Sequence, residues 1–202
     1  MNKVIHMISY YAEWIVKKLV RENLIEEREK PIYQYGTEML IVMILNFFSI
    51  FIIGFFSKNL ISCILYILIF VTVRTQTGGY HAATYLRCWC LGCTVYLMIL
   101  VLTEKSPLFL DDTKIIYTLP VIIIAISYHT YILCMLKNKE SRKKICVCAT
   151  ARSIGWAGIA VWIQNVFRAT MLVNVIIFTL LAILFFLVIE ERRVIWKRRK
   201  KC

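Results

Sequence analysis

Proline, glycine and acidic residues are all scarce in this sequence. The 202 residues include three prolines and seven glycines, which excludes a collagen-like chain and argues against extended disorder. Only 12 residues are acidic, against 25 Lys and Arg, so the formal net charge is +13. Hydrophobic residues make up 60% of the chain, whereas a soluble domain has about 45–50%. We therefore predict an all-α, polytopic membrane protein.

Six apolar segments predict a bundle of about six transmembrane helices. A helical span needs about 20 residues, and the second and third segments have only 15 each, so they need flanking residues to cross. Arg152 interrupts the fifth segment, which is the weakest of the six. The segments are residues 39–57, 59–73, 88–102, 115–136, 145–167 and 170–189.

The positions of the basic residues predict the orientation of these spans. With both termini in the cytoplasm, 21 of the 25 Lys and Arg lie inside and four lie outside. Such an excess on the cytoplasmic side is the usual signature of membrane topology. The charge is therefore explained without a nucleic-acid partner. The basic segments 137–144 and 190–202 are expected to contact anionic membrane lipids.

The first 35 residues predict a cytoplasmic amphipathic region that lies on the membrane surface. Apolar residues recur there at helical spacing, and Pro31 and Gly36 are expected to break the chain before the first span. The first 38 residues contain six basic and six acidic residues, so a cleaved signal peptide is not expected. A six-span domain over 36–189 and a basic cytoplasmic tail over 190–202 complete the predicted organisation. The apolar stripe comprises Ile8, Ala12, Ile15 and Leu19.

The segment 74–88, between the second and third apolar runs, carries the candidate chemistry. His81 can exchange a proton near neutral pH, and Cys88 supplies a thiol at the membrane boundary. Together they predict a nucleophile and its general base. Residues seven apart on a straight helix lie about 10 Å apart along its axis, so the chain must bend or re-enter between Gly78 and Cys88 if they cooperate.

Other residues of this segment are candidates for supporting roles. Gly78 and Gly79 permit the bend, because glycine adopts backbone conformations closed to other residues. Arg74 can anchor a carboxylate or phosphate of a substrate. Gln76 or Thr77 can orient His81 by a hydrogen bond, and the sequence does not choose between them.

A metal site and a transporter are the alternatives to this enzyme. Cys88, Cys90 and Cys93 with His81 form a possible zinc set, but positions 88 and 90 point to different faces of a helix. No metal or other cofactor is therefore expected. Transporters carry polar groups near the bilayer midplane, whereas here they concentrate at one boundary. The single histidine within a span, His129, is expected to pack inside the bundle.

The run from Arg74 through Gly79 and His81 to Cys88 resembles the accessory gene regulator protein B (AgrB) family of bacterial membrane cysteine endopeptidases. The resemblance includes Ala82 directly after the histidine and the cysteine seven residues after it. The six apolar segments and the amphipathic N-terminus also agree. In one respect the chain differs from the family. The basic loop between the fourth and fifth spans is usually longer in the family and contains prolines, whereas KNKESRKK (residues 137–144) is short and has none.

The resemblance implies a function in quorum sensing. Members cleave a short amphipathic precursor peptide (AgrD-like) through an acyl-thioester and assist its cyclisation to a thiolactone or lactone. By the same resemblance, Cys88 is the nucleophile, His81 the general base, and Arg74 and Gly79 are supporting residues. It further implies a homodimer in the bacterial plasma membrane.

Overall fold

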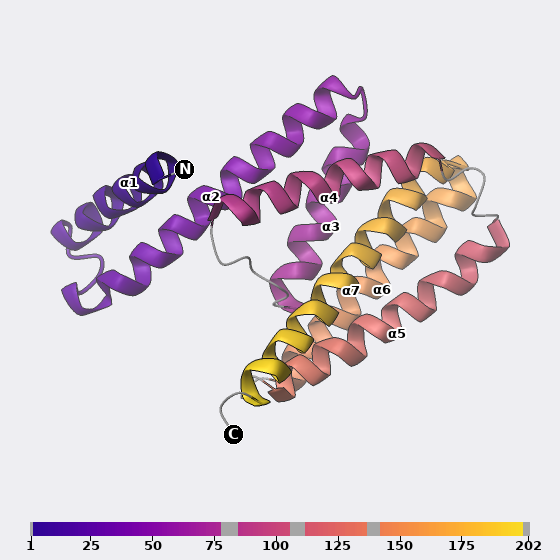
Figure 1. Cartoon of the computed structure of the whole chain (residues 1–202). Helices are drawn as coiled ribbons and strands as arrows, with labels where there is room; N and C mark the ends of the chain where they lie inside the picture. The colour runs from indigo at the N-terminus through magenta and orange to yellow at the C-terminus, as the bar shows by residue number, and fades with distance from the viewer. Residues whose placement is uncertain (1, 78–84, 106–111, 137–141, 200–202) are drawn as a thin grey trace. The chain divides into compact units, whose positions relative to one another are not determined.

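The computed structural model describes residues 2–77, 85–105, 112–136 and 142–199. Over these residues the chain consists of helices and contains no strand, which confirms the predicted all-α class (Figure 1). Seven α-helices and a short 3-10 helix, η1 (Glu27–Glu29), make up this part of the chain. The α-helices are α1 (Asn2–Arg21), α2 (Lys30–Phe56), α3 (Leu60–Thr77), α4 (Tyr85–Lys105), α5 (Asp112–Leu136), α6 (Arg142–Phe167) and α7 (Thr170–Arg199).

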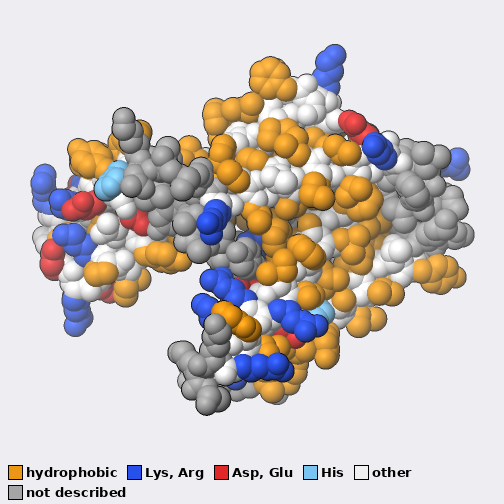
Figure 2. Space-filling view, viewed as in Figure 1, with side chains coloured by type: hydrophobic (Ala, Val, Ile, Leu, Met, Phe, Trp, Pro, Cys, Tyr) orange, Lys and Arg blue, Asp and Glu red, His pale blue; other side chains and the backbone are white. Residues whose placement is uncertain are grey.

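Five of the described helices are long and apolar enough to cross a membrane. The first, Glu27–Phe56, comprises η1 and α2, and the other four lie within α4, α5, α6 and α7. Helix α3 adds a shorter apolar stretch, Leu60–Arg74. The third predicted segment gains its length from flanking residues, as α4 begins at Tyr85 and ends at Lys105. Hydrophobic side chains cover much of the visible surface of these helices (Figure 2). Such exposed apolar faces are typical of a membrane protein, in which lipid covers them.

The chain forms two compact units. The N-terminal unit comprises residues 1–56 and 81–94, and the C-terminal unit comprises residues 57–80 and 95–202. Helix α4 contributes to both, since its first ten residues belong to the N-terminal unit and the rest to the C-terminal unit.

In the N-terminal unit, α1 packs along α2 (Figure 1). Two residues of the predicted stripe, Ile8 and Ala12, are buried together with Val16, whereas Ile15 and Leu19 are only partly buried. The Ser9 hydroxyl donates a hydrogen bond to the Glu38 carboxylate on α2. The opposite side of α1 exposes large aromatic side chains, which suit the boundary between water and lipid. These are Tyr10, Tyr11 and Trp14.

The break expected at Pro31 and Gly36 is wrong, because α2 begins at Lys30 and runs through both residues. Pro31 lies in the first turn, where a helix tolerates proline because the missing N–H has no partner within the helix. Gly36 weakens an exposed helical position by only about 0.5–1 kcal/mol. The break instead falls before η1, where Glu26 and Glu29 form a capping box.

Three of the helices are followed closely by a residue with positive φ. Arg168 (φ 49°) directly follows α6, and Asn23 (φ 55°) and Lys58 (φ 56°) lie two residues beyond the ends of α1 and α2. A left-handed residue at this position redirects the chain and lets its amides bond the last free carbonyls of the helix. Two such bonds are made after α1, from the Leu24 amide to the Leu19 carbonyl (3.0 Å) and from the Asn23 amide to the Val20 carbonyl (3.0 Å).

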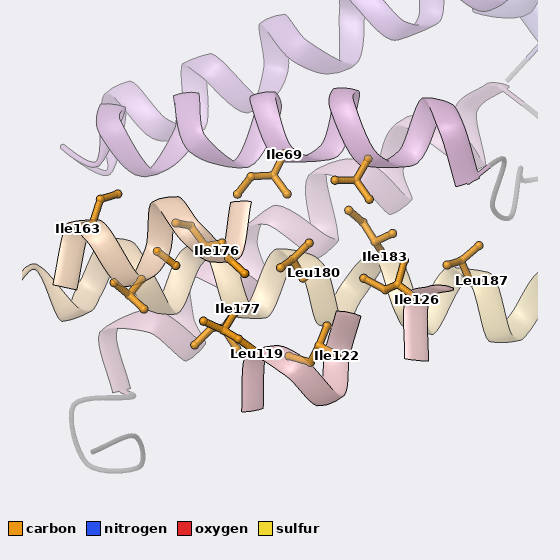
Figure 3. Packing of buried hydrophobic residues seen from close by; sticks show 14 of the residues in the cluster. Ile69, Leu119, Ile122, Ile126, Ile163, Ile176, Ile177, Leu180, Ile183 and Leu187 are labelled. Carbon is orange, nitrogen blue, oxygen red and sulfur yellow. The ribbon is translucent and has the colours of Figure 1, made fainter. Parts of the chain in front are cut away.

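The core of the C-terminal unit lies between α3, α5, α6 and α7 (Figure 3). Helix α7 supplies its largest share, because buried residues occur on most sides of its first half. A helix that is apolar all round is typical of the centre of a bundle. The residues labelled in Figure 3 are Ile69 on α3, Leu119, Ile122 and Ile126 on α5, Ile163 on α6, and Ile176, Ile177, Leu180, Ile183 and Leu187 on α7.

Helix α7 continues ten residues beyond the predicted end of the last span, to Arg199. Two side chains of this extension form hydrogen bonds with α5. Glu191 bonds His129, and the Arg198 guanidinium donates to the Leu136 carbonyl at the end of α5. Lys and Arg side chains gather at the C-terminal end of α7 (Figure 2). The described part of the predicted basic tail is therefore helical, and two of its side chains contact α5.

Candidate active site

Cys88 is the fourth residue of α4. Its side chain is half-buried and its thiol is free, whereas the neighbours Arg87 and Cys90 are exposed. The position thus combines a free thiol with partial shielding from water.

Two polar residues on α2 hold the first turns of α4. The Trp89 indole Nε1 donates a hydrogen bond to Ser49 Oγ at 2.9 Å. One turn further along α4, Cys93 Sγ lies 3.8 Å from Asn46 Oδ1 and donates to it. Both contacts are within the N-terminal unit. Because Trp89 directly follows Cys88, the contact with Ser49 fixes the backbone that carries the candidate nucleophile.

Gly92 allows α4 to approach α2 at this point. A Cβ atom at residue 92 would lie 2.4 Å from Asn46 Nδ2 and 2.7 Å from Asn46 Oδ1. Asn46 is itself buried, at 9% exposure. A small residue that admits a polar side chain from a neighbouring helix is a common feature of helix packing in membranes. The glycine and the asparagine therefore act as a complementary pair.

Sequence reasoning missed Asn46, Ser49, Trp89 and Gly92 as a supporting group. A signal was available, because Asn46 is a strongly polar residue in the middle of an apolar run. Such residues within spans usually face another helix and form hydrogen bonds there. The sequence gives no indication that the partner is the helix carrying Cys88.

Arg74, the predicted anchor, lies on α3 in the C-terminal unit. Its guanidinium carbon is 4.8 Å from the ring centroid of Phe70 and 5.0 Å from that of Phe186 on α7. Stacking of a guanidinium on two aromatic faces is favourable and fixes its direction. The side chain is thus held in place by packing within this unit.

The other predicted site residues are only partly described. The backbone of Gln76 and Thr77 forms the last turn of α3. Gly78, Gly79 and His81 lie outside the described residues, as does the bend predicted between Gly78 and Cys88. The pairing of His81 with Cys88 therefore stays a prediction.

Among the described residues, no three Cys, His, Asp or Glu side chains come together in a way that could hold a metal ion. Cys88 and Cys90 are two positions apart on the continuous helix α4, so their thiols point in different directions. The seven cysteines in the described part of the chain are free thiols.

In the C-terminal unit, His129 forms a polar contact with Glu191. Its Nδ1 lies 2.6 Å from Glu191 Oε2, and the two side chains are 24% and 15% exposed. His129 comes from α5 and Glu191 from α7, so the contact joins two helices of the bundle. A hydrogen bond to a carboxylate also fixes the orientation and tautomer of an imidazole.

Replacing His129 with alanine is expected to destabilise the protein. Loss of the imidazole leaves the mostly buried Glu191 carboxylate without this partner, which costs about 1–3 kcal/mol. A lower melting temperature in detergent would show the effect. The double variant H129A/E191A should lose less than the sum of the two single variants. Strictly additive losses would contradict a direct interaction.

The described helices and Cys88 define a polytopic helical membrane protein with a candidate nucleophile at the start of a helix. The model of the family described as "Accessory gene regulator B" matches residues 12–189. This match covers most of the chain, which therefore belongs to the accessory gene regulator B family. The matched residues include His81 and Cys88.

Two curated proteins of Clostridium perfringens are similar to this chain. "Putative AgrB-like protein" of strain SM101 / Type A is 26% identical over 122 residues. "Putative AgrB-like protein 2" of strain 13 / Type A is 23% identical over 122 residues. In both cases the alignment covers 60% of this chain and 57% of the relative, so the chain spans little more than half the length of these relatives. No solved structure matches the chain.

Proposed function

We propose that this protein is a membrane cysteine endopeptidase that cleaves a short quorum-sensing precursor peptide and assists its cyclisation. The observation that carries the proposal is the family match over residues 12–189, which includes both His81 and Cys88. The thiol of Cys88 in the first turn of α4 supports it, because this thiol is free and only half-buried, so a substrate can reach it.

The reaction begins with proton transfer from the Cys88 thiol to the His81 imidazole. The thiolate attacks the scissile carbonyl carbon, the C–N bond breaks, and the imidazolium returns the proton to the leaving amine. The upstream fragment of the precursor is then bound to Cys88 as a thioester. A thiol or hydroxyl within that fragment attacks the same carbonyl, closes the ring and releases Cys88. Exchange of one thioester for another is nearly balanced in energy, so a thiolactone forms without ATP.

Supporting roles are proposed for other residues of the predicted segment 74–88. Arg74 binds an anionic group of the precursor, and the stacking on Phe70 and Phe186 fixes its direction. Gly78 and Gly79 bend the chain, and Gln76 or Thr77 orients His81. The N–H groups near the start of α4 stabilise negative charge at the reacting centre.

We also propose a location in the bacterial plasma membrane with both termini in the cytoplasm. The 21 basic residues assigned to that side support this orientation. The precursor, lying on the same leaflet, reaches Cys88 by diffusion in two dimensions. Reporter fusions at the two ends measure the orientation. A homodimer belongs to the same proposal, and native mass spectrometry measures the oligomeric state.

Trapping of the acyl-enzyme tests the proposed reaction. The full-length protein is co-expressed with an AgrD-like precursor, denatured rapidly and analysed by mass spectrometry. We expect a C-terminal fragment of the precursor and a mass adduct on Cys88 that hydroxylamine removes, because thioesters react with this nucleophile. Release of the fragment without an adduct in rapidly quenched samples, together with turnover by a Cys88→Ser variant, would contradict a covalent cysteine mechanism.

A further inference from the structure

A groove between α3 and α6 is not used by the proposed reaction. Its volume is about 350 Å³, and it lies entirely within the C-terminal unit. Four of its residues form one stripe along α6, because they follow each other at helical spacing. The groove is lined by Val71 and Thr72 on α3 and by Arg152, Gly155, Trp156 and Ile159 on α6.

Thr72 is the centre of the polar part of the groove. Arg152 Nη1 donates to the Thr72 carbonyl oxygen at 2.7 Å, and Trp156 Nε1 donates to Thr72 Oγ1 at 2.9 Å. A guanidinium has five N–H donors, and the Thr72 carbonyl is its hydrogen-bond partner within the described residues. Arg152 is exposed and forms no ion pair within the same residues. Most of the N–H donors of Arg152 are therefore available to a group outside the protein.

The position of Arg152 in a candidate span favours a negative charge nearby. The span runs from Lys144 to Phe167, and Arg152 lies eight residues after Lys144, or about 12 Å along the helix axis. On insertion scales an arginine at the centre of a span costs about 2.5–3.5 kcal/mol, so a charged partner stabilises an arginine inside a span. The Thr72 carbonyl satisfies a hydrogen bond but does not neutralise the charge. A phosphate does both, and its geometry matches the guanidinium fork.

The rest of the groove is apolar and open. Val71, Ile159 and the Trp156 ring form its walls. A Cβ atom placed at Gly155 would meet no other atom within 4 Å, so the glycine leaves space at the base of the groove. A ligand with an anionic head and a hydrocarbon tail matches both parts.

We propose that this groove binds one anionic phospholipid, whose phosphate lies on Arg152 and whose acyl chain lies over Gly155. Charge complementarity selects such a lipid over a zwitterionic one, because the choline group of phosphatidylcholine cancels the charge of its own phosphate. The site is formed by α3 and α6 alone and does not depend on the proposed peptidase reaction.

Native mass spectrometry of the full-length protein in detergent tests the proposal by titration with phosphatidylglycerol or phosphatidylcholine. We expect the wild type to bind one phosphatidylglycerol more tightly than phosphatidylcholine. In Arg152→Gln the apparent Kd for phosphatidylglycerol should rise about tenfold, the effect of losing one charge-assisted hydrogen bond. Arg152→Lys should lose less, because it keeps the charge without the fork.

Gly155→Leu tests the apolar part, since its Cβ would meet no protein atom within 4 Å and the rest of its side chain would occupy space in the groove. We expect a loss of phosphatidylglycerol binding of tenfold or more. Gly158→Leu is the matched control, because it also lies on α6, also has no atom within 4 Å of an added Cβ, and does not line the groove. Equal affinity of the wild type for the two lipids, or unchanged binding in Gly155→Leu, would overturn the proposal. Unchanged lipid binding combined with lost precursor cleavage in Gly155→Leu would assign the groove to the peptide instead.

Discussion

Replacing Cys88 with alanine is expected to lower precursor cleavage by a factor of at least about 10³, because removing a covalent nucleophile eliminates the chemical step. The protein should remain folded, since Cys88 is only half-buried and none of the described polar contacts between α2 and α4 uses its sulfur. Cleavage is measured by mass spectrometry of the precursor after co-expression. Cys88→Ser should also be inactive, because a hydroxyl is much harder to deprotonate than a thiol.

Two neighbouring cysteines provide matched controls for this prediction. Cys90 is exposed and Cys93 donates to Asn46, so neither is assigned to the reaction. Cys90→Ala and Cys93→Ala should therefore leave cleavage largely intact. If all three alanine variants lost activity equally, a shared metal site would explain the result better than a single nucleophile.

Replacing Gly92 with leucine is expected to displace α4 from α2. Even a Cβ atom there lies within 2.7 Å of both amide atoms of Asn46, and leucine adds three further carbons. Overpacking of this kind costs about 1–3 kcal/mol. It should also break the 2.9 Å bond between Trp89 and Ser49 beside Cys88. Because a shift of about 1 Å in a reacting group can cost about 100-fold in rate, cleavage should fall by this order.

Thermal unfolding in detergent measures the loss of stability in Gly92→Leu, and the precursor assay measures the loss of cleavage. Gly36→Leu is the control, because Gly36 lies on α2 with no other atom within 4 Å of a Cβ and should tolerate the larger side chain. The milder Gly92→Ala should be partly rescued by Asn46→Ala, with a coupling of about 0.5–3 kcal/mol. Additive losses, or a normal melting temperature and activity in Gly92→Leu, would contradict the close packing of these helices.

Hydrophobic patterning was sufficient to predict the helices but not all of their ends. The apolar runs correspond to α2 through α7, because a helix that crosses a bilayer must be apolar over most of its length. The break before α2 was misplaced because Pro31 was interpreted as a breaker rather than as a first-turn residue. The better signal was the pair Glu26 and Glu29, which forms the capping box.

The candidate site could be located from the sequence, but its support could not. Cys88 and His81 can be identified from a local sequence motif, and recognising such a motif requires no knowledge of the fold. The contacts of Asn46 with α4 and of His129 with Glu191 join residues 47 and 62 positions apart. Which faces of two helices meet depends on the packing of the whole bundle, and nothing in either helix alone specifies it.

The short apolar length of α3 has a consequence for the membrane itself. The stretch Leu60–Arg74 contains 15 residues, which span about 22 Å at the helical rise, against about 30 Å of hydrocarbon in an ordinary bilayer. Such hydrophobic mismatch is relieved when the surrounding lipid thins. The bilayer would then be thinner around the end of α3 that carries Arg74. The lipid headgroups would then lie closer to that arginine.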